Sequence, residues 1–368
     1  MVCGGGPASS PAGRSREFST DAFVARAAAE PGGHSEGMLV PSALAPSIVP
    51  SPIALLRAGD VPHAERSLSR GELVRVRRGV YAPGNLWRAL PPWEKYLARM
   101  HAFGLLAPGA VFSHESAAAL WGMPVLGDPV TVHVTVPPSS AARETGGVRA
   151  HRATDPPQSV ATSGLLVVAP AETAVTLARH RHPAYGLAVV DATLRLDPTA
   201  TLAELNGDNE TRDSIRGRRH ARWALERADA KRESVLESVS AAAIEWLGFP
   251  LPELQKPFPG FAGGLYRADM WWPDLRLVGE PDGESKYDGR FGDPAELLRA
   301  RHERDRALRA AGAAAIAHWG WIDVALMSPL RQLLTGHGLR PVHREDSGRL
   351  ASLAHLLTPY ARRSPSPH

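Results

Sequence analysis

Apolar residues at helical and strand spacing predict an ordered run of elements in the last third of the chain. Residues 231–247 carry Leu236, Val239, Ala243 and Trp246 at helical intervals, which predicts one amphipathic helix. Further elements are predicted at 253–258, 265–272 and 275–280 (strands), 294–311 (helix), 313–319 (strand) and 321–334 (helix). The order is helix, three strands, helix, strand, helix. It predicts an α/β (α+β) domain over 221–335.

The front of the chain has a different pattern, of two short helices followed by a basic hairpin. Residues 51–59 and the stretch "HAERSLSRGEL" predict the helices. In "LVRVRRGVYAP", Arg75 and Arg77 alternate with valines, and the strand turns at Arg78-Gly79. This pattern is typical of a small winged helix-turn-helix over 51–90. It is equally typical of an ordinary exposed hairpin whose outer face is rich in arginine.

Residues 93–205 predict a mixed α/β middle region. "PVTVHVTVP" and "LLVVAP" predict strands, whereas "SHESAAALWGM", "AETAVTLARH" and "GLAVVDATLRL" predict helices. No ligand spacing links His114, His133 and His151, so we expect these histidines to satisfy local hydrogen bonds rather than to bind a metal. The polar stretch "NGDNETRDSIRGRRH", at 206–220, predicts a domain boundary.

Composition and charge exclude several classes of protein but do not identify one. The chain has 368 residues, 43% of them hydrophobic, and a net charge of +4, which permits a nucleic-acid partner without requiring one. The single Cys3 excludes a disulfide framework and a cysteine-based zinc site. No apolar run is long enough to span a bilayer, so we expect a cytoplasmic protein without a membrane partner. Gly-, Ala-, Ser- and Pro-rich ends predict disorder at 1–45 and 357–368, and Met38 is an alternative translation start to Met1.

Candidate chemistry lies on the hairpin formed by the second and third strands of the predicted C-terminal domain. With a two-residue turn at Pro273-Asp274, Asp269 lies opposite Val278 and diagonal to Glu280, about 7–8 Å away between backbones. Two such carboxylates repel unless a proton or cation intervenes, and Mg²⁺ prefers oxygen ligands. One interpretation is a metal site that includes Asp282 on the same face. The other is a solvated strand end in which Asp282 begins a turn.

The order of elements and the motifs within it resemble a known superfamily. Residues 231–325 resemble the very-short-patch-repair-like branch of the PD-(D/E)xK nucleases, which have a restriction-endonuclease-like αβββαβ fold. The resemblance rests on "ESVLES", on Asp269 before "WWPDLRLV", on "GEPDGESKY", and on "RHERDRALRAAG" leading to "HWGW". This sequence departs from the family pattern at Pro281, which lacks a backbone donor and predicts that the strand ends or bulges there.

The resemblance implies metal-assisted hydrolysis of a phosphodiester bond. Asp269 and Glu280 would hold Mg²⁺ (or Mn²⁺), Glu237 would be the acid of the first helix, and Asp282 and Lys286 would complete the catalytic set. Arginines of the wing and of the helix at 294–311 would contact DNA phosphates. They are Arg75, Arg77, Arg78, Arg299, Arg304 and Arg306.

The front of the chain is similar to AbiEi-type antitoxins of type IV toxin–antitoxin systems. "LVRVRRGVYAP" is similar to their wing, and "SHESAAALWGM" and "LLVVAPAETAVTLARHR" to the region that follows. This resemblance implies DNA as a partner, together with a cognate toxin or defence-system protein. Two functions remain open: a DNA-binding nuclease, and a non-catalytic antitoxin-like transcriptional regulator whose nuclease-like domain is only a scaffold.

Overall fold

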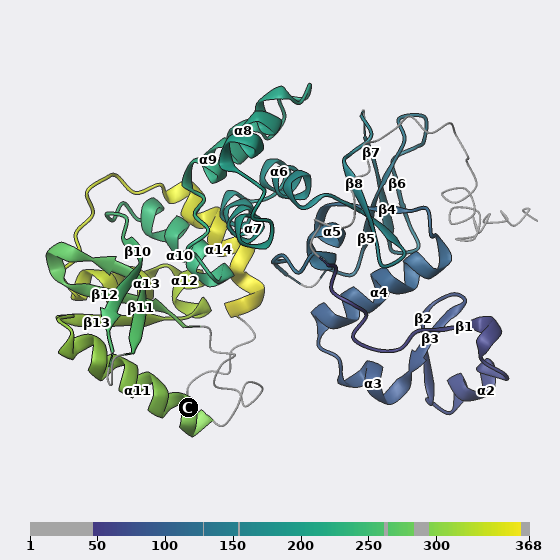
Figure 1. The fold of residues 1–368 in the computed structure, drawn as a ribbon, viewed down its shortest axis with the longest axis horizontal. Coiled ribbons are helices and arrows are strands. Elements are labelled where there is room, and N and C mark those ends of the chain that lie inside the picture. The colour runs from purple at the N-terminus through teal and green to yellow at the C-terminus, as the bar shows by residue number, and fades with distance from the viewer. Residues whose placement is uncertain (1–46, 128, 154, 261–263, 283–293, 362–368) are drawn as a thin grey trace, which may run out of the picture.

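The computed structural model describes residues 47–127, 129–153, 155–260, 264–282 and 294–361 (Figure 1). Our predictions for the segment 1–45, for Met38, for Lys286 and for residues 362–368 lie outside the described residues.

The first unit is a three-stranded antiparallel sheet in the order β1-β3-β2, with two short helices. The predicted hairpin is confirmed, with its turn at Arg78-Gly79. The predicted helix at 51–59 is wrong, because Leu56 and Arg57 pair with β3 and a 3₁₀ turn follows them. Backbone pairing with a neighbouring strand thus overrides the helical spacing there. The elements are β1 (Leu56–Arg57), η1 (Ala58–Asp60), α2 (Ala64–Ser69), β2 (Leu73–Arg77), β3 (Val80–Pro83) and α3 (Gly84–Ala89).

The second unit contains a six-stranded mixed sheet in the order β6-β7-β5-β4-β9-β8. The predicted strands in "PVTVHVTVP" and "LLVVAP" are confirmed as β5 and β9, and Ser113 is the N-cap of α5. Helix α4 connects this sheet with the first unit, since it packs on both β2 and β5. The elements are α4 (Pro92–Leu106), β4 (Val111–Phe112), α5 (His114–Leu120), β5 (Val132–Val136), β6 (Arg143–Thr145), β7 (Val148–Arg152), β8 (Ser159–Thr162) and β9 (Leu165–Val168).

A layer of helices lies between this sheet and the C-terminal one (Figure 1). It consists of α6 (Pro170–His180), α7 (Pro183–Leu196), α8 (Leu202–Thr211) and α9 (Arg218–Arg227). Most of the polar stretch at 206–220, where we predicted a domain boundary, belongs to α8 and α9. Thr201 and Glu204 form a capping box that starts α8 despite its polar composition.

The C-terminal unit has the predicted order of elements. Its sheet runs β10-β11-β12-β13, with β12 and β13 parallel and the other pairs antiparallel. The expected disordered tail is wrong for 357–361, which belong to α14 and bury Leu357. The elements are α10 (Val235–Trp246), β10 (Glu253–Pro259), β11 (Leu265–Trp272), η3 (Pro273–Leu275), β12 (Leu277–Pro281), α11 (Pro294–Ala310), β13 (Ala315–Trp319), α12 (Trp321–Leu326), α13 (Ser328–Gly336) and α14 (Ser347–Ala361).

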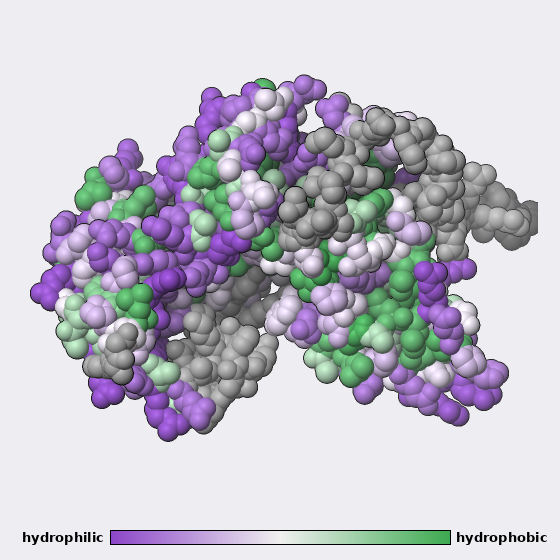
Figure 2. Space-filling view, in the orientation of Figure 1, coloured by the Kyte–Doolittle hydropathy of each residue, from purple (hydrophilic) through white to green (hydrophobic). Residues whose placement is uncertain are grey.

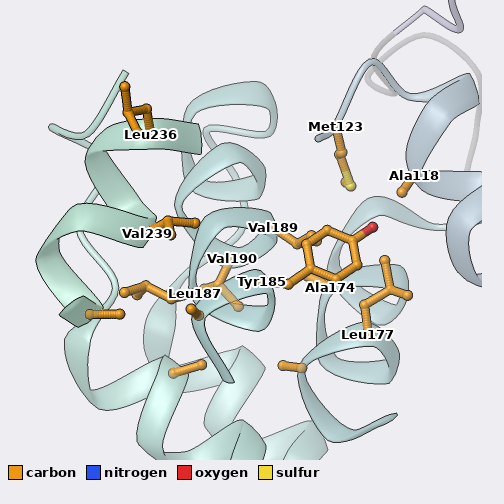
Figure 3. Packing of buried hydrophobic residues seen from close by; sticks show 14 of the residues in the cluster. Ala118, Met123, Ala174, Leu177, Tyr185, Leu187, Val189, Val190, Leu236 and Val239 are labelled. Atoms are coloured by element: carbon orange, nitrogen blue, oxygen red, sulfur yellow. The ribbon is translucent and has the colours of Figure 1, made fainter. Parts of the chain in front are cut away.

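Both faces of the C-terminal sheet are covered, and one of its two cores is shared with the rest of the protein. On one face, Met270, Trp272 and Leu277 join a cluster that continues through α10 and α7 into the six-stranded sheet. Figure 3 shows the helical part of this cluster, with Leu236 and Val239 of α10 on the same side of α7 as Leu187. On the other face, a smaller cluster packs against α11. In the part of the chain that the structure describes, we find no helix with the length and apolarity required of a membrane span.

Candidate functional site

The register of the β11–β12 hairpin sets the positions of the candidate carboxylates. The predicted two-residue turn is wrong: Pro273–Leu275 form a 3₁₀ turn, Arg276 is left-handed, and Trp272 pairs with Leu277. Continuing this register places Asp269 directly opposite Glu280, where Cβ atoms are typically about 5 Å apart. The error amounts to two residues, and side chains alternate with a period of two, so the two acids still share one face.

Asp269 is half-buried among other carboxylates. Gln255 of β10 donates a hydrogen bond from Nε2 to Oδ1 of Asp269 over 3.2 Å. Burial, followed by the charges of Glu280 and Glu237, raises the pKa of Asp269 from 3.8 to about 8. The structure thus brings three of the predicted residues into one electrostatic group, in which Asp269 favours its protonated form at neutral pH.

Glu280 is 4% exposed and pairs with a cation of the protein itself. The Nη2 atom of Arg304, on α11, lies 3.0 Å from Oε1 and 2.8 Å from Oε2 of Glu280. The same nitrogen donates to the backbone carbonyl of Arg267 on β11. Burial raises the pKa of Glu280, and the charge of Arg304 opposes that rise. Arg304 was predicted to contact DNA, but in the structure its guanidinium donates hydrogen bonds to two strands of the sheet.

Glu237 has a local structural role at the start of α10. Its backbone amide donates to Oγ of the N-cap Ser234 (3.1 Å), and its carboxylate accepts from the amide of Glu233 (3.0 Å). The side chain is buried at 6% exposure. Capping of this kind satisfies amides that lack an intrahelical partner, so the presence of an acid at this position has an explanation besides catalysis.

Asp282 is linked to His318 and Asp305, which lie in the motifs quoted for the nuclease resemblance but were not predicted as site residues. His318 of β13 lies between two carboxylates, with Nδ1 3.0 Å from Asp282 and Nε2 3.1 Å from Asp305 of α11. β12 ends at Pro281, as predicted, and the amide of Asp282 beyond it donates to the carbonyl of Trp319. Only the parallel register of β12 and β13 places His318 there, which is why spacing along the chain gave no signal.

The described acids do not fit Mg²⁺ as they stand. Both oxygens of Glu280 face the Arg304 guanidinium. Among the described residues, no group of three or more His, Cys, Asp or Glu side chains is placed so that it could hold a metal ion. Lys286 of the predicted catalytic set lies outside those residues.

The other predicted DNA-binding arginines divide into surface and internal residues. Arg75, Arg78, Arg299 and Arg306 are exposed, and Arg75 makes a surface pair with Glu65 at 3.1 Å. Hydrophilic residues predominate around α11, at the lower left of Figure 2. Arg77 points inward instead and donates to the carbonyls of Gly146 and Gly147 in the turn between β6 and β7. Burial, followed by the charge of Arg99, lowers the pKa of Arg77 to about 10.

No spacing along the sequence links the histidines of the middle region, but the structure brings them together in one cluster. Nδ1 of His133 and Nε2 of His151 are 2.8 Å apart, and the ring of His114 stacks on His151 at a centroid distance of 3.8 Å. Glu115 lies beside His133 and is held by Arg181. These residues come from β5, β7, α5 and the end of α6, so no local spacing could have revealed the cluster.

This cluster predicts a loss of stability in mild acid. Burial, followed by neighbouring charges, lowers the pKa of His114 to about 2 and of His151 to about 4. The unfolded chain takes up protons below about pH 6.5 whereas the folded one does not, so stability falls as pH drops from about 6.5 toward 4. Each histidine changes the free energy of unfolding by at most about 1.4 kcal/mol per pH unit. The change is smaller for His151, because this side chain is partly exposed and solvent screens its charge.

Urea unfolding between pH 7 and pH 4.5 would measure this effect. We expect His114→Asn to flatten the profile, since asparagine tolerates the left-handed backbone of His114 (φ 50°). His355→Asn, at an exposed position, is the matched control. Parallel profiles for wild type and His114→Asn would contradict the prediction.

Comparison with known proteins supports the antitoxin part of the sequence analysis. The family model described as the AbiEi antitoxin C-terminal domain matches residues 109–227, from β4 to the end of α9. Two proteins of Mycobacterium tuberculosis, the uncharacterized proteins MT2308 (strain CDC 1551) and Rv2248 (strain H37Rv), are each 36% identical over 233 residues. That match covers 63% of this chain and 80% of each relative. The chain belongs to the family of these mycobacterial proteins.

No solved structure matches the chain. The AbiEi match lies in the region for which we had noted a resemblance to AbiEi-type antitoxins, and it extends past the predicted boundary at 205 to residue 227. Neither the family model nor the relatives are described as nucleases. The resemblance to very-short-patch-repair-like enzymes therefore stays a prediction.

Proposed function

We propose that the chain is an antitoxin-like regulator of a toxin–antitoxin or defence system, and that it acts by binding DNA and a cognate protein without catalysis. The observation that carries this proposal is the AbiEi antitoxin match over 109–227. That segment contains all six strands of the six-stranded sheet and the layer of helices α6–α9. Basic charge in the first unit supports the DNA-binding part, since residues 51–90 contain seven arginines and three acids.

Co-expression tests the regulatory part of the proposal. The full chain would be produced together with each protein encoded beside its gene, and growth of the host would be measured. An antitoxin should restore growth that one of these neighbours inhibits. If none of the neighbours is toxic, or if toxicity persists with the full chain present, the antitoxin proposal is wrong.

DNA binding is expected to depend on the exposed arginines of the hairpin. Replacing Arg75 and Arg78 by alanine should weaken binding to a duplex from the region upstream of the gene, and should reduce the salt dependence by about one unit of slope per lost phosphate contact. Fluorescence anisotropy across a salt series measures both. The matched control is Arg299→Ala/Arg306→Ala on α11, which removes two exposed arginines from the other end of the protein.

The inward Arg77 must stay in place in that experiment. Its guanidinium lies over the Phe103 ring, 5.0 Å from the centroid, and bonds the β6–β7 turn, so its loss would disturb the contact between the first two units. If the α11 variant loses affinity while the hairpin variant keeps it, the DNA-binding surface is not the hairpin.

A metal-dependent nuclease is the second candidate function, and one observation favours it. Asp269 and Glu280 face each other on neighbouring strands, as the resemblance implies for the ligands of Mg²⁺. Nicking of plasmid DNA in the presence of Mg²⁺, abolished by both Asp269→Ala and Glu280→Ala, would establish this function. Intact plasmid after incubation with folded protein would exclude it for DNA.

A further inference from the structure

Three acids of the C-terminal sheet already have partners from within the protein. Glu280 faces Arg304, Asp269 accepts from Gln255, and Asp282 pairs with His318. Each partner comes from a different element: α11, β10 and β13. A site built to receive a cation would leave carboxylate oxygens directed at one point, with waters completing the shell. Here the oxygens of Glu280 are directed at a guanidinium.

We propose that Arg304 takes the place of the metal ion in this sheet, so that the described acids Asp269, Glu280 and Asp282 hold no Mg²⁺ or Mn²⁺ in the native chain. The inference does not depend on the antitoxin function. It concerns only how the charge of Glu280 is balanced, and it accounts for the misfit between the acids and a metal site.

The packing of α11 fixes Arg304 at this position. Ala307 and Leu308, within one turn of Arg304, are 1% and 0% exposed, and Leu308 packs in the cluster that contains Trp271 and Val278. These contacts hold the helix against the face of the sheet that carries the acids. The same guanidinium nitrogen also caps the carbonyl of Arg267 on β11. Arg304 is therefore anchored to both strands of the hairpin, and is not a surface arginine that has met Glu280 by chance.

A divalent ion at Glu280 would have to displace this contact. The ion would otherwise lie within a few ångströms of a fixed guanidinium in a largely buried site, where repulsion between like charges is weakly screened. Asp269 cannot take over as the sole ligand, because hard cations need several oxygens. Removal of the guanidinium charge should have the opposite effect, since Glu280 and Asp269 would then face each other without the counter-ion that Arg304 supplies.

Mn²⁺ binding to the full chain tests the proposal directly. The signal of free Mn²⁺ in electron paramagnetic resonance, supported by calorimetry, should show no site in wild type at about 1 mM metal. Arg304→Gln should gain one site, and Glu280→Gln/Arg304→Gln should lose it again. Arg299→Gln is the matched control, because Arg299 lies on the same helix with its side chain 73% exposed.

Two outcomes would overturn the proposal: Mn²⁺ binding by wild type that Asp269→Asn removes, or a folded Arg304→Gln variant that binds none. A further measurement needs no variant with an altered Arg304. A ligand that binds the folded state raises the thermal midpoint of unfolding. Since we expect no binding, the midpoint of wild type should be the same in about 5 mM Mn²⁺ and in chelator. A rise in the midpoint that disappears in Asp269→Asn would equally contradict the inference.

Discussion

Asp269→Asn is expected to stabilise the protein, and to do so more strongly as the pH rises. The folded pKa of Asp269 is about 8 and its ordinary value is 3.8, so the folded state keeps a proton that the unfolded state releases in this window. The contribution of Asp269 to wild-type stability therefore falls as pH rises from about 4 to 8, opposite in sign to the contribution of the histidine cluster below pH 6.5. Asparagine is neutral throughout and can still accept the hydrogen bond from Gln255. The gain should reach the order of 3 kcal/mol at pH 8.

Urea unfolding of wild type and Asp269→Asn at several pH values between 5 and 8.5 would measure this gain. Asp274→Asn is the matched control, because Asp274 is an exposed acid in the turn of the same hairpin. Its effect should stay within about 0.5 kcal/mol at every pH. A loss of stability in Asp269→Asn at pH 8, or a difference that does not change with pH, would show that the carboxylate is stabilised as an anion.

The placement of Asp269 and Glu280 on one face could be predicted from the sequence because alternation along strands is robust. The turn was misjudged, yet an error of two residues leaves every side chain on the same side. The identity of their partners could not be predicted. Arg304 and His318 reach the acids through the packing of α11 and the parallel pairing of β13, which join residues far apart in the chain.

The hairpin of the first unit shows the opposite case, in which alternation misleads. Arg75 and Arg77 were placed on one outer face, but the register shifts between them, so that Arg75 pairs with Tyr81 and Arg77 with Val80. An irregularity of this kind changes the side to which the following residue points. Arg77 consequently turns into the protein while Arg75 stays outside. The local sequence did not predict this bulge, because Arg77 bonds to Gly146 and Gly147, which belong to the second unit.

Arg232→Met is expected to destabilise the protein by about 3–5 kcal/mol, because it leaves Asp191 buried without its counter-ion. Asp191, on α7, has no exposed surface; Arg232 lies 2.9 Å from it and Ser238 of α10 donates to it over 2.7 Å. Burial raises the pKa of Asp191, and the charge of Arg232 opposes that rise. This network joins the last turns of α7 to the start of α10, at the boundary between the AbiEi match and the C-terminal sheet.

Urea unfolding would measure the loss, and the double variant Asp191→Leu/Arg232→Met should recover much of it, since an apolar pair of similar volume removes both charges. Arg331→Met is the matched control: it breaks the surface pair with Glu345 and should cost about 1 kcal/mol or less.

Because the larger core continues from the six-stranded sheet into α10, wild type should unfold in one transition. Two separate transitions in Arg232→Met would show that this pair couples the antitoxin-like region to its scaffold. An unchanged midpoint would show that the shared apolar core holds them together without it.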